Sequence, residues 1–377
     1  MNPRERLINT LNHREPDVIP IDIGSAGATT LLIPTYENLL KHLGLDLPIR
    51  VMSPEFNMAM IDEDVLQKLN IGLRCLRPGK PPLAKKVVGE DYFTNEWGVT
   101  YYKPAGGYYY DINRFPLSEA NSPEDIEQYP FPDPTDPSLY EGLEERVLHL
   151  YHDTDYAIIA ETGNSVFEQA WYLRGLENIF NDMYFNKNLL HTLLRKITDV
   201  NLEKTKRFLD IAAPYIQVYF VSDDLASQNG LLISLPMYRE FIKPYQAECY
   251  AYIKKRTTAK IAYHSCGSIR KLIPELIEIG VDAINPVQVS AQNMDTRDLK
   301  KEFGNEISFW GAIDTQRILP YGTEKEIAEE VKKRIDDLAP GGGYVLAAVH
   351  AIQPDVSPEN ILYMLKYAEE YGRYFSL

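Results

Sequence analysis

The sequence predicts one α/β domain built as a (β/α)8 (TIM) barrel with a β-rich insertion. After residue 137, short apolar runs typical of strands alternate with longer amphipathic segments typical of helices, and this alternation favours a parallel sheet. A length of 377 residues suits one barrel with insertions. A doubly wound open sheet is the alternative, but no glycine-rich nucleotide turn follows the first expected strand. We therefore expect residues 1–377 to form a single barrel domain.

The N-terminal elements are well marked. Asn2 is expected to cap a helix that has Pro3 at its first position. The first strand is expected over residues 18–23, followed by a loop of small residues, 24–30. Further elements of this region are two helices at 35–43 and 61–69 and a strand at 71–76.

Between residues 81 and 131 the sequence pattern changes to short β-prone segments, which are rich in tyrosine and valine and are separated by Gly and Pro. This pattern predicts a β-rich excursion from the barrel that covers the active site. Beyond it, strands are expected at 156–160, 215–221, 260–263, 283–284, 307–310 and 343–347. Helices are expected at 186–211, 236–255, 268–279, 295–303, 325–338 and 358–374.

Composition excludes several classes of function. A formal net charge of −15 argues against binding to nucleic acid or to an anionic membrane, because phosphate contacts need clustered Lys and Arg. Three cysteines are too few for a disulfide framework, so we expect reduced thiols and a cytoplasmic location. No run approaches the 18 apolar residues of a membrane span, and the N-terminus does not have the pattern of a signal peptide.

The strand expected at 260–263 ends in His264 and Cys266. Side chains alternate along a strand, so these two face the same side, and imidazole with thiolate suits zinc. A chance pairing of a structural histidine with a buried cysteine is the alternative. The carboxyl end of a barrel strand, where such folds place their chemistry, favours the metal. His350 follows another apolar run and completes a His2Cys set with an open fourth position, as in a catalytic zinc site.

Other polar residues follow the expected strands, and each has an ordinary alternative as a helix cap or turn former. They are Asp22, Glu161, Asp223, Asp224, Gln228, Asn285, Gln288, Asp314, Gln316 and Gln353.

Several segments together resemble the uroporphyrinogen decarboxylase superfamily over nearly the whole chain. They are 223–230, 263–267, 285–288, 310–316 and 341–346, with 3–7 and 16–20 near the N-terminus. The resemblance implies a (β/α)8 barrel and two candidate activities. Decarboxylases of this superfamily need no cofactor and hold their polycarboxylate substrate with an N-terminal arginine-rich motif, which the 24–30 loop lacks. The corrinoid-dependent methyltransferase branch uses zinc held by His-X-Cys and a third ligand, often cysteine, whose place His350 takes here.

The resemblance thus implies a zinc-dependent methyltransferase of anaerobic metabolism. It would move a methyl group between a small methylated substrate, for instance a methoxylated aromatic in O-demethylation, and cobalamin. No corrinoid motif is present, so the cobalamin is expected on a partner corrinoid protein, and a homodimer is reasonable. The alternatives are a cofactor-free decarboxylase that depends on Asp223 or Asp224, and an accessory protein that binds a corrinoid or tetrapyrrole without turnover. The expected roles are metal binding by His264, Cys266 and His350, catalysis by Glu161, Asp223 and Asp224, and substrate binding by Gln228, Asn285, Gln288, Asp314 and Gln316.

Overall fold

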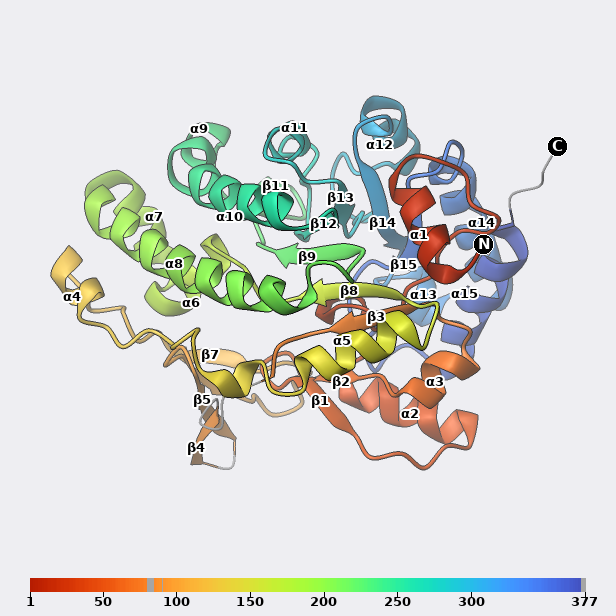
Figure 1. Ribbon diagram of the computed structural model, residues 1–377, viewed down its shortest axis with the longest axis horizontal. Coiled ribbons are helices and arrows are strands. Elements are labelled where there is room, and N and C mark those ends of the chain that lie inside the picture. Colours follow the sequence, from red (N-terminus) through yellow and green to blue (C-terminus); the bar gives the residue numbers. More distant parts are fainter. Residues whose placement is uncertain (80–84, 90, 374–377) are drawn as a thin grey trace.

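The computed structural model describes residues 1–79, 85–89 and 91–373. Seven strands form one curled parallel sheet in the order β15-β14-β13-β12-β9-β8-β3, with helices along its outer side (Figure 1). This arrangement confirms the α/β barrel class. The strands are β3 (Leu73–Leu76), β8 (Ala157–Glu161), β9 (Val218–Ser222), β12 (Lys260–His264), β13 (Ala283–Asn285), β14 (Ser308–Ile313) and β15 (Tyr344–Ala348).

The first expected strand, 18–23, is not a regular strand. It lies beside β15 through one parallel bridge between Ile21 and Leu346, and the Leu346 N–H donates to the carbonyl of Pro20. Pro20 has no N–H to extend a ladder, which accounts for the short pairing. This segment therefore lies beyond β15 at one edge of the sheet, while β3 is the other edge. It also carries the buried Asp22, whose Oδ2 accepts a hydrogen bond from the Trp310 indole at 2.9 Å.

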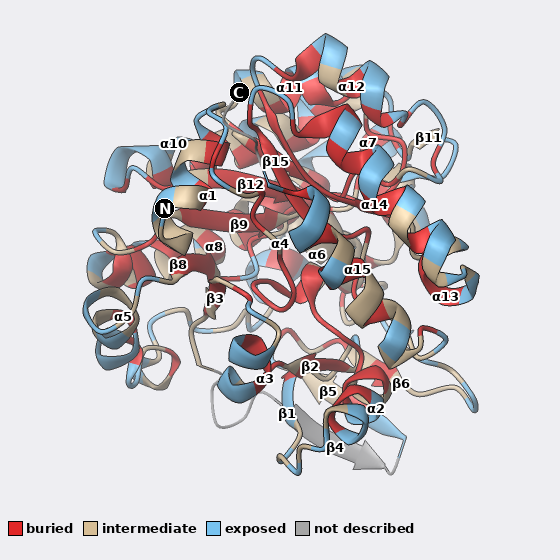
Figure 2. Cartoon of the chain, turned by 90° about the vertical axis from the view of Figure 1, so that its right-hand side faces the viewer, coloured by how far each residue is buried: buried red, intermediate tan, exposed pale blue. Residues whose placement is uncertain are grey.

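The barrel interior is filled by side chains from alternate strand positions. Small alanines surround two large rings, Phe220 and Trp310, which meet edge to face with centroids 6.1 Å apart. A second, larger apolar layer lies between the sheet and the helices. In Figure 2 the strands of the seven-stranded sheet are almost entirely buried, and the helices expose their outer faces. The interior packing closes the barrel below its carboxyl-terminal mouth, so ligands must bind at that mouth.

The main helices agree with the expected positions to within a few residues, with two exceptions. A π-helical segment, Tyr238–Ile242, interrupts the helix expected at 236–255, because Pro244 offers no N–H to the carbonyl four residues earlier. The helix expected to begin at residue 268 begins only at Ile273. The main helices are α1 (Pro3–Leu11), α2 (Ile33–Leu43), α3 (Glu63–Lys68), α5 (Leu143–His152), α6 (Phe167–Arg174), α7 (Leu176–Phe185), α8 (Lys187–Ala212), α10 (Lys243–Arg256), α11 (Ile273–Glu278), α12 (Thr296–Phe303), α14 (Glu324–Leu338) and α15 (Pro358–Tyr371). The short ones are α4 (Pro123–Glu127), α9 (Leu235–Met237) and α13 (Ile318–Tyr321).

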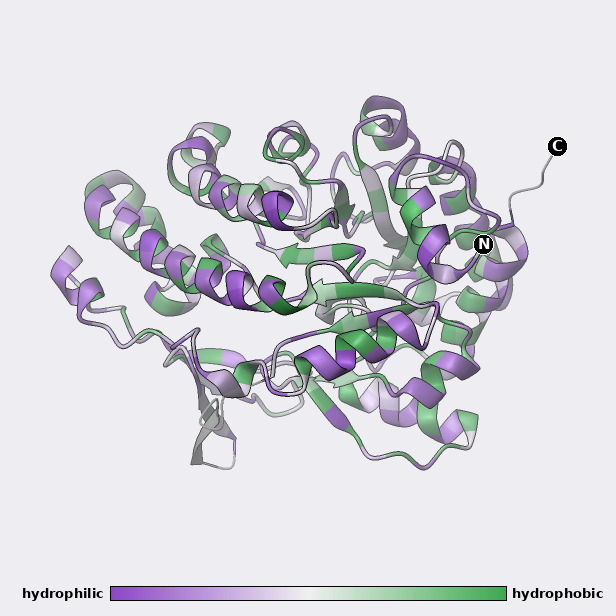
Figure 3. Ribbon diagram, viewed as in Figure 1, coloured by the Kyte–Doolittle hydropathy of each residue, from purple (hydrophilic) through white to green (hydrophobic). Residues whose placement is uncertain are grey.

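The helix surfaces that face solvent are polar, and the apolar residues gather toward the sheet (Figure 3). Within the part of the chain that the structure describes, no helix combines the length and the apolar character that crossing a membrane requires.

A four-stranded antiparallel sheet occupies most of the excursion expected at 81–131, apart from residues 81–84 and 90, which lie outside the described residues. The last strand begins at Asp111, so residues 108–110, a run of three tyrosines in the β-prone region, form irregular backbone instead. The Tyr110 N–H donates to the carbonyl of Glu55 and ties the excursion to a small hairpin of β1 and β2. These strands are β1 (Arg50–Ser53), β2 (Met58–Met60), β4 (Lys85–Gly89), β5 (Tyr92–Asn95), β6 (Thr100–Tyr102) and β7 (Asp111–Arg114).

Gly267 allows a second hairpin, β10 (Ala226–Ser227) with β11 (Gly230–Leu231), to lie against the end of β12. Its φ of +90° is in the left-handed region, and an added Cβ would stand 2.5 Å from the carbonyl oxygen of Ser227. We expect Gly267→Ala to lower the free energy of unfolding by about 2 kcal/mol, from backbone strain and this collision. Urea denaturation measures the change. Gly44→Ala is a control with a positive φ but no atom within 4 Å of the added Cβ, and it should cost less.

Candidate metal centre

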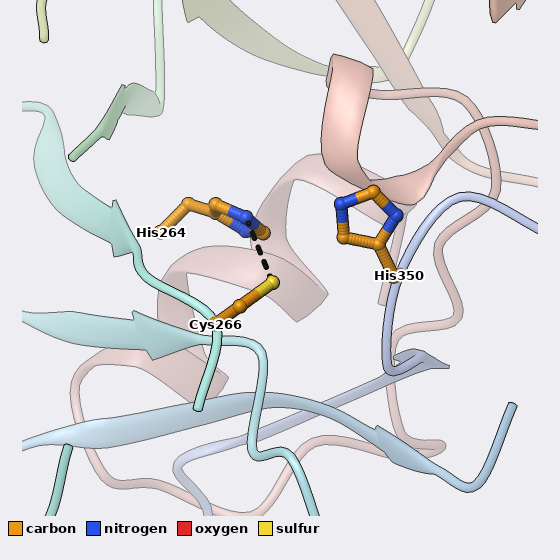
Figure 4. Close-up of side chains that lie close together, drawn as sticks. All are labelled: His264, Cys266 and His350. Carbon is orange, nitrogen blue, oxygen red and sulfur yellow. Dashed lines mark hydrogen bonds between the residues drawn. The ribbon is translucent and has the colours of Figure 1, made fainter. Parts of the chain in front are cut away.

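His264, Cys266 and His350 meet at the mouth of the barrel (Figure 4). His264 ends β12, Cys266 follows it in the loop, and His350 comes two residues after β15. One ligand atom from each residue lies within 4.8 Å of the other two, and the Cys266 Sγ is 3.6 Å from the His264 Nε2. In Figure 4 the His264 ring and the cysteine sulfur point toward one another, and the His350 ring faces them from the other side.

The spacing of His264 and Cys266 fits two ligands of one zinc ion. Zn–S and Zn–N bonds of the usual length in a tetrahedron place sulfur and nitrogen about 3.6 Å apart. The His264 Nδ1 is 2.6 Å from the Asn285 Oδ1, and an amide oxygen only accepts hydrogen bonds. The ring proton is therefore on Nδ1, which leaves the Nε2 lone pair free for a metal on the Cys266 side. Three protein ligands leave the fourth position of a tetrahedron for a substrate.

The protonation of the two remaining ligands also depends on their surroundings. Burial lowers the pKa of His350 to about 4, with the charge of His264 acting in the same direction, so this imidazole is neutral and able to bind a metal. Burial, with the carboxylates of Asp224 and Glu168, raises the pKa of the Cys266 thiol. A divalent cation at the cluster would oppose that effect and stabilise the thiolate.

The neighbouring aspartates after β9 have different surroundings. The Asp224 Oδ1 accepts the Cys266 N–H at 2.7 Å and lies 3.9 Å from the His264 Nε2, so its carboxylate borders the cluster. Asp223 is fully buried and its carboxylate is directed at the start of α6. There it accepts the N–H groups of Val166, Phe167 and Glu168 at 2.7–3.1 Å, and the amide of Gln246 at 2.8 Å.

Asp223 therefore does not line the cavity, contrary to the expectation of a catalytic contact. Its oxygens are saturated by the amides that begin α6, and burial raises its pKa to about 6. The carboxylate holds α6 against β9 and so supports the site from behind.

Of the five residues expected to bind substrate, two line the cavity and three do not. Gln288 and Gln316 line the cavity, and Asn285 lies behind His264 as its hydrogen-bond partner. Gln228 and Asp314 do not line it. Gln228 is exposed at the turn of the β10–β11 hairpin, and the Asp314 Oδ1 accepts the N–H of Gln316, as a turn former does. Substrate binding by Gln228 and Asp314 therefore has no support from the cavity lining and stays a prediction.

A large open cavity, about 2020 Å³, extends from the cluster toward β3 and the excursion. Glu161 lines it at the end of β8, and its carboxylate accepts the Gly27 N–H at 3.1 Å and lies 3.5 Å from the Arg77 Nε. The excursion contributes aromatic side chains, including Tyr101 and Tyr109. The Tyr109 hydroxyl accepts a hydrogen bond of 2.8 Å from the Gln353 amide, three residues beyond His350, and so brings the excursion over the mouth.

Sequence reasoning did not identify Glu168 and Tyr172, which line the cavity from α6. The Tyr172 hydroxyl donates to the Glu168 carboxylate. Burial and the nearby Asp224 raise the pKa of Glu168 to about 8, so it is mostly protonated at neutral pH. Glu168 lies seven residues beyond the end of β8, too far for a search of strand ends to find it.

The sequence model of the family described as "Uroporphyrinogen decarboxylase (URO-D)" matches residues 113–371. The chain belongs to the uroporphyrinogen decarboxylase family. Among curated members, the chain is 28% identical over 194 residues to a uroporphyrinogen decarboxylase of Chlorobium phaeobacteroides, covering 50% of this chain and 51% of that one. It is 25% identical over 181 residues to a methylated-thiol–coenzyme M methyltransferase of Methanosarcina mazei, covering 45% and 42%. The chain therefore spans about half the length of the curated relatives it matches.

A solved structure extends the likeness of fold to the whole chain. A methyltransferase from Methanosarcina mazei superposes with a TM-score of 0.67 over 98% of this chain and 99% of that one, at 16% identity. The N-terminal elements before residue 113 therefore also belong to a fold that this protein shares with that methyltransferase.

Proposed function

We propose that the protein is a zinc-dependent methyltransferase. It moves a methyl group between a small methylated compound, such as a methoxylated arene, and a cobalamin carried by a separate corrinoid protein. The observation that carries the proposal is the meeting of His264, Cys266 and His350 at the barrel mouth, where all three side chains line the cavity. The methyltransferase names of a relative and of a structural neighbour support it.

Each residue of the site has a task in this reaction. Zinc, when bound, acts as a Lewis acid that stabilises a leaving oxyanion or lowers the pKa of a thiol. Asn285 keeps the His264 imidazole in the tautomer that can bind the ion, and Asp224 holds the backbone of Cys266. The protonated Glu168 and the carboxylate of Glu161 face the same cavity, where they position the substrate and exchange protons with it.

The alternative of a decarboxylase acting on a polycarboxylate is less well supported. Such a substrate needs several arginines with free guanidinium edges. Of the cavity-lining arginines in the described part of the chain, Arg74 forms a bidentate pair with Glu63, and Arg50 pairs with Asp62. The Arg77 Nε lies 3.5 Å from Glu161, and Arg146 donates to two backbone carbonyls. The small-residue loop 24–30 contributes none.

The metal content of the protein tests the proposal. We expect protein purified without chelator to contain about one zinc per chain and to methylate cob(I)alamin from a methoxylated arene. A strong chelator should remove both the zinc and the activity, and added zinc should restore them. Protein that takes up no zinc at neutral pH, or that transfers methyl groups equally well without it, would contradict the mechanism.

A further inference from the structure

Glu168 and Tyr172 form a hydrogen-bonded pair on the wall of the cavity. They lie one turn apart in α6, and the Tyr172 hydroxyl donates to the Glu168 Oε1. Both side chains are partly exposed and line the cavity, so a molecule bound there can reach them. Among the described residues, the Glu168 carboxyl group has no other hydrogen-bond partner and no ion pair with Lys or Arg. Its second oxygen is therefore available to a ligand.

A series of short contacts connects this pair to the metal cluster. The Glu168 N–H donates to the Asp223 Oδ1 at 2.7 Å. The next residue, Asp224, accepts the Cys266 N–H at 2.7 Å, and its Oδ1 lies 3.9 Å from the His264 Nε2. Besides burial, the charges of Asp224 and Glu168 both raise the pKa of the Cys266 thiol. Glu168 therefore belongs to the part of the cavity wall that adjoins the cluster.

The surroundings keep Glu168 in its acid form. Burial raises its pKa to about 8, and the charges of Asp224 and Asp223 act in the same direction, against the hydrogen bond from Tyr172. Because Tyr172 donates to one oxygen, the carboxyl proton of Glu168 is on the other oxygen. A carboxylic acid that is neutral at neutral pH and lines a reaction cavity is suited to general acid catalysis.

A neutral acid at this place favours one class of methyl donor. A methyl ether leaves an alkoxide or a phenolate, which is a strong base and takes up a proton. A methylated ammonium leaves a neutral amine, which needs no proton, and a methyl thioether leaves a thiolate, which is a weaker base than a phenolate. Of the three classes, the ether therefore gains most from a proton donor.

We propose that Glu168 is the proton donor for the leaving oxygen of a methyl ether and that Tyr172 holds it in position. The assignment rests on the proposed function, which supplies the corrinoid acceptor. The bond between the methyl carbon and the ether oxygen breaks with its electron pair on oxygen, and that oxygen takes the Glu168 proton. The methyl group passes to the Co(I) of the cobalamin, which supplies the electron pair of the new bond and becomes Co(III). The Glu168 carboxylate then recovers a proton from water.

The test compares methyl transfer to cob(I)alamin from two neutral ethers, anisole and para-cyanoanisole. Phenol is a poorer leaving group than cyanophenol, so its release depends more on a proton donor. Glu168→Gln is expected to lower transfer from anisole by about 100-fold, a typical contribution of a general acid, and from the cyano compound by about 10-fold or less. Glu177→Gln is the matched control and should keep both rates. Glu177 has the same second position in α7, is exposed and does not line the cavity.

Infrared spectroscopy adds a measurement that needs no turnover. At neutral pH the wild type should show the absorption of a protonated carboxyl group, which Glu168→Gln removes and Glu177→Gln retains. The absorption should disappear as the pH rises. In Tyr172→Phe it should persist to a higher pH than in the wild type, because the hydrogen bond from Tyr172 lowers the pKa of Glu168. The titratable groups whose charges interact with Glu168 are Tyr172 of α6, Asp223 and Asp224 after β9, Tyr101 of β6 and Cys266 after β12.

Equal losses for the two ethers in Glu168→Gln would overturn the assignment, as would a carboxyl absorption that survives in that variant. Full activity in Glu168→Gln would also overturn it and would keep the methyltransferase. An absorption that disappears at a lower pH in Tyr172→Phe would overturn the role of Tyr172. Wild-type protein that shows the absorption but methylates no cobalamin from either ether would refute the methyltransferase, and the assignment with it.

Discussion

Cys266→Ala is expected to abolish zinc binding and to lower methyl transfer by at least about 10³-fold, equivalent to roughly 4 kcal/mol of transition-state stabilisation. The Cys266 sulfur is 3.6 Å from the His264 Nε2, and without it only the two imidazoles remain as ligands in the cluster. Two neutral ligands hold zinc much less firmly than three with a thiolate among them. Zinc per chain, measured by elemental analysis, and the rate of cobalamin methylation should fall together.

The matched control is Cys249→Ala. Cys249 is buried in α10 and does not line the cavity, so the same chemical change there should leave zinc content and methyl transfer intact. Methyl transfer retained by Cys266→Ala would rule out the zinc mechanism. Zinc retained with activity lost would show instead that the thiolate has a role besides holding the ion.

Asp223→Ala is expected to destabilise the fold by about 3 kcal/mol or more, although Asp223 does not touch the cavity. The substitution leaves three backbone N–H groups at the start of α6 and the amide of Gln246 without their acceptor in a buried place. Each buried donor left unpaired costs about 1–3 kcal/mol of folding stability. The substitution also removes the cost of burying a carboxylate, and this gain offsets part of the loss. Urea denaturation followed by circular dichroism measures the loss.

The adjacent Asp224 supplies the comparison. Its side chain is 35% exposed and accepts one backbone N–H, from Cys266, so Asp224→Ala should change stability by about 1 kcal/mol or less. The same substitution should lower zinc affinity and methyl transfer, because it loosens the loop that carries Cys266. If Asp223→Ala protein is stable but inactive, Asp223 acts in the reaction and not in stabilising the fold. The decarboxylase alternative requires that role.

The sequence by itself determined the barrel class and the placement of His264 and Cys266 at one strand end. Strands and helices of a parallel barrel have local apolar periodicities, and these placed all seven strands of the sheet within a few residues. The spacing of His264 and Cys266 also has a local cause, since both follow one strand end. The strand expected at 18–23 is not regular, and this difference also has a local cause, because Pro20 prevents the ladder from continuing.

Only the tertiary structure decided which polar residues face the cavity. Asp223 and Asp224 are neighbours with the same side chain, yet one anchors α6 and the other borders the metal cluster. Glu168 and Tyr172 of α6 line the same cavity as Glu161 of β8 only because those elements pack together. Periodicity reports the environment of a residue along its own strand or helix, whereas the direction of a loop side chain depends on contacts between segments distant in the chain.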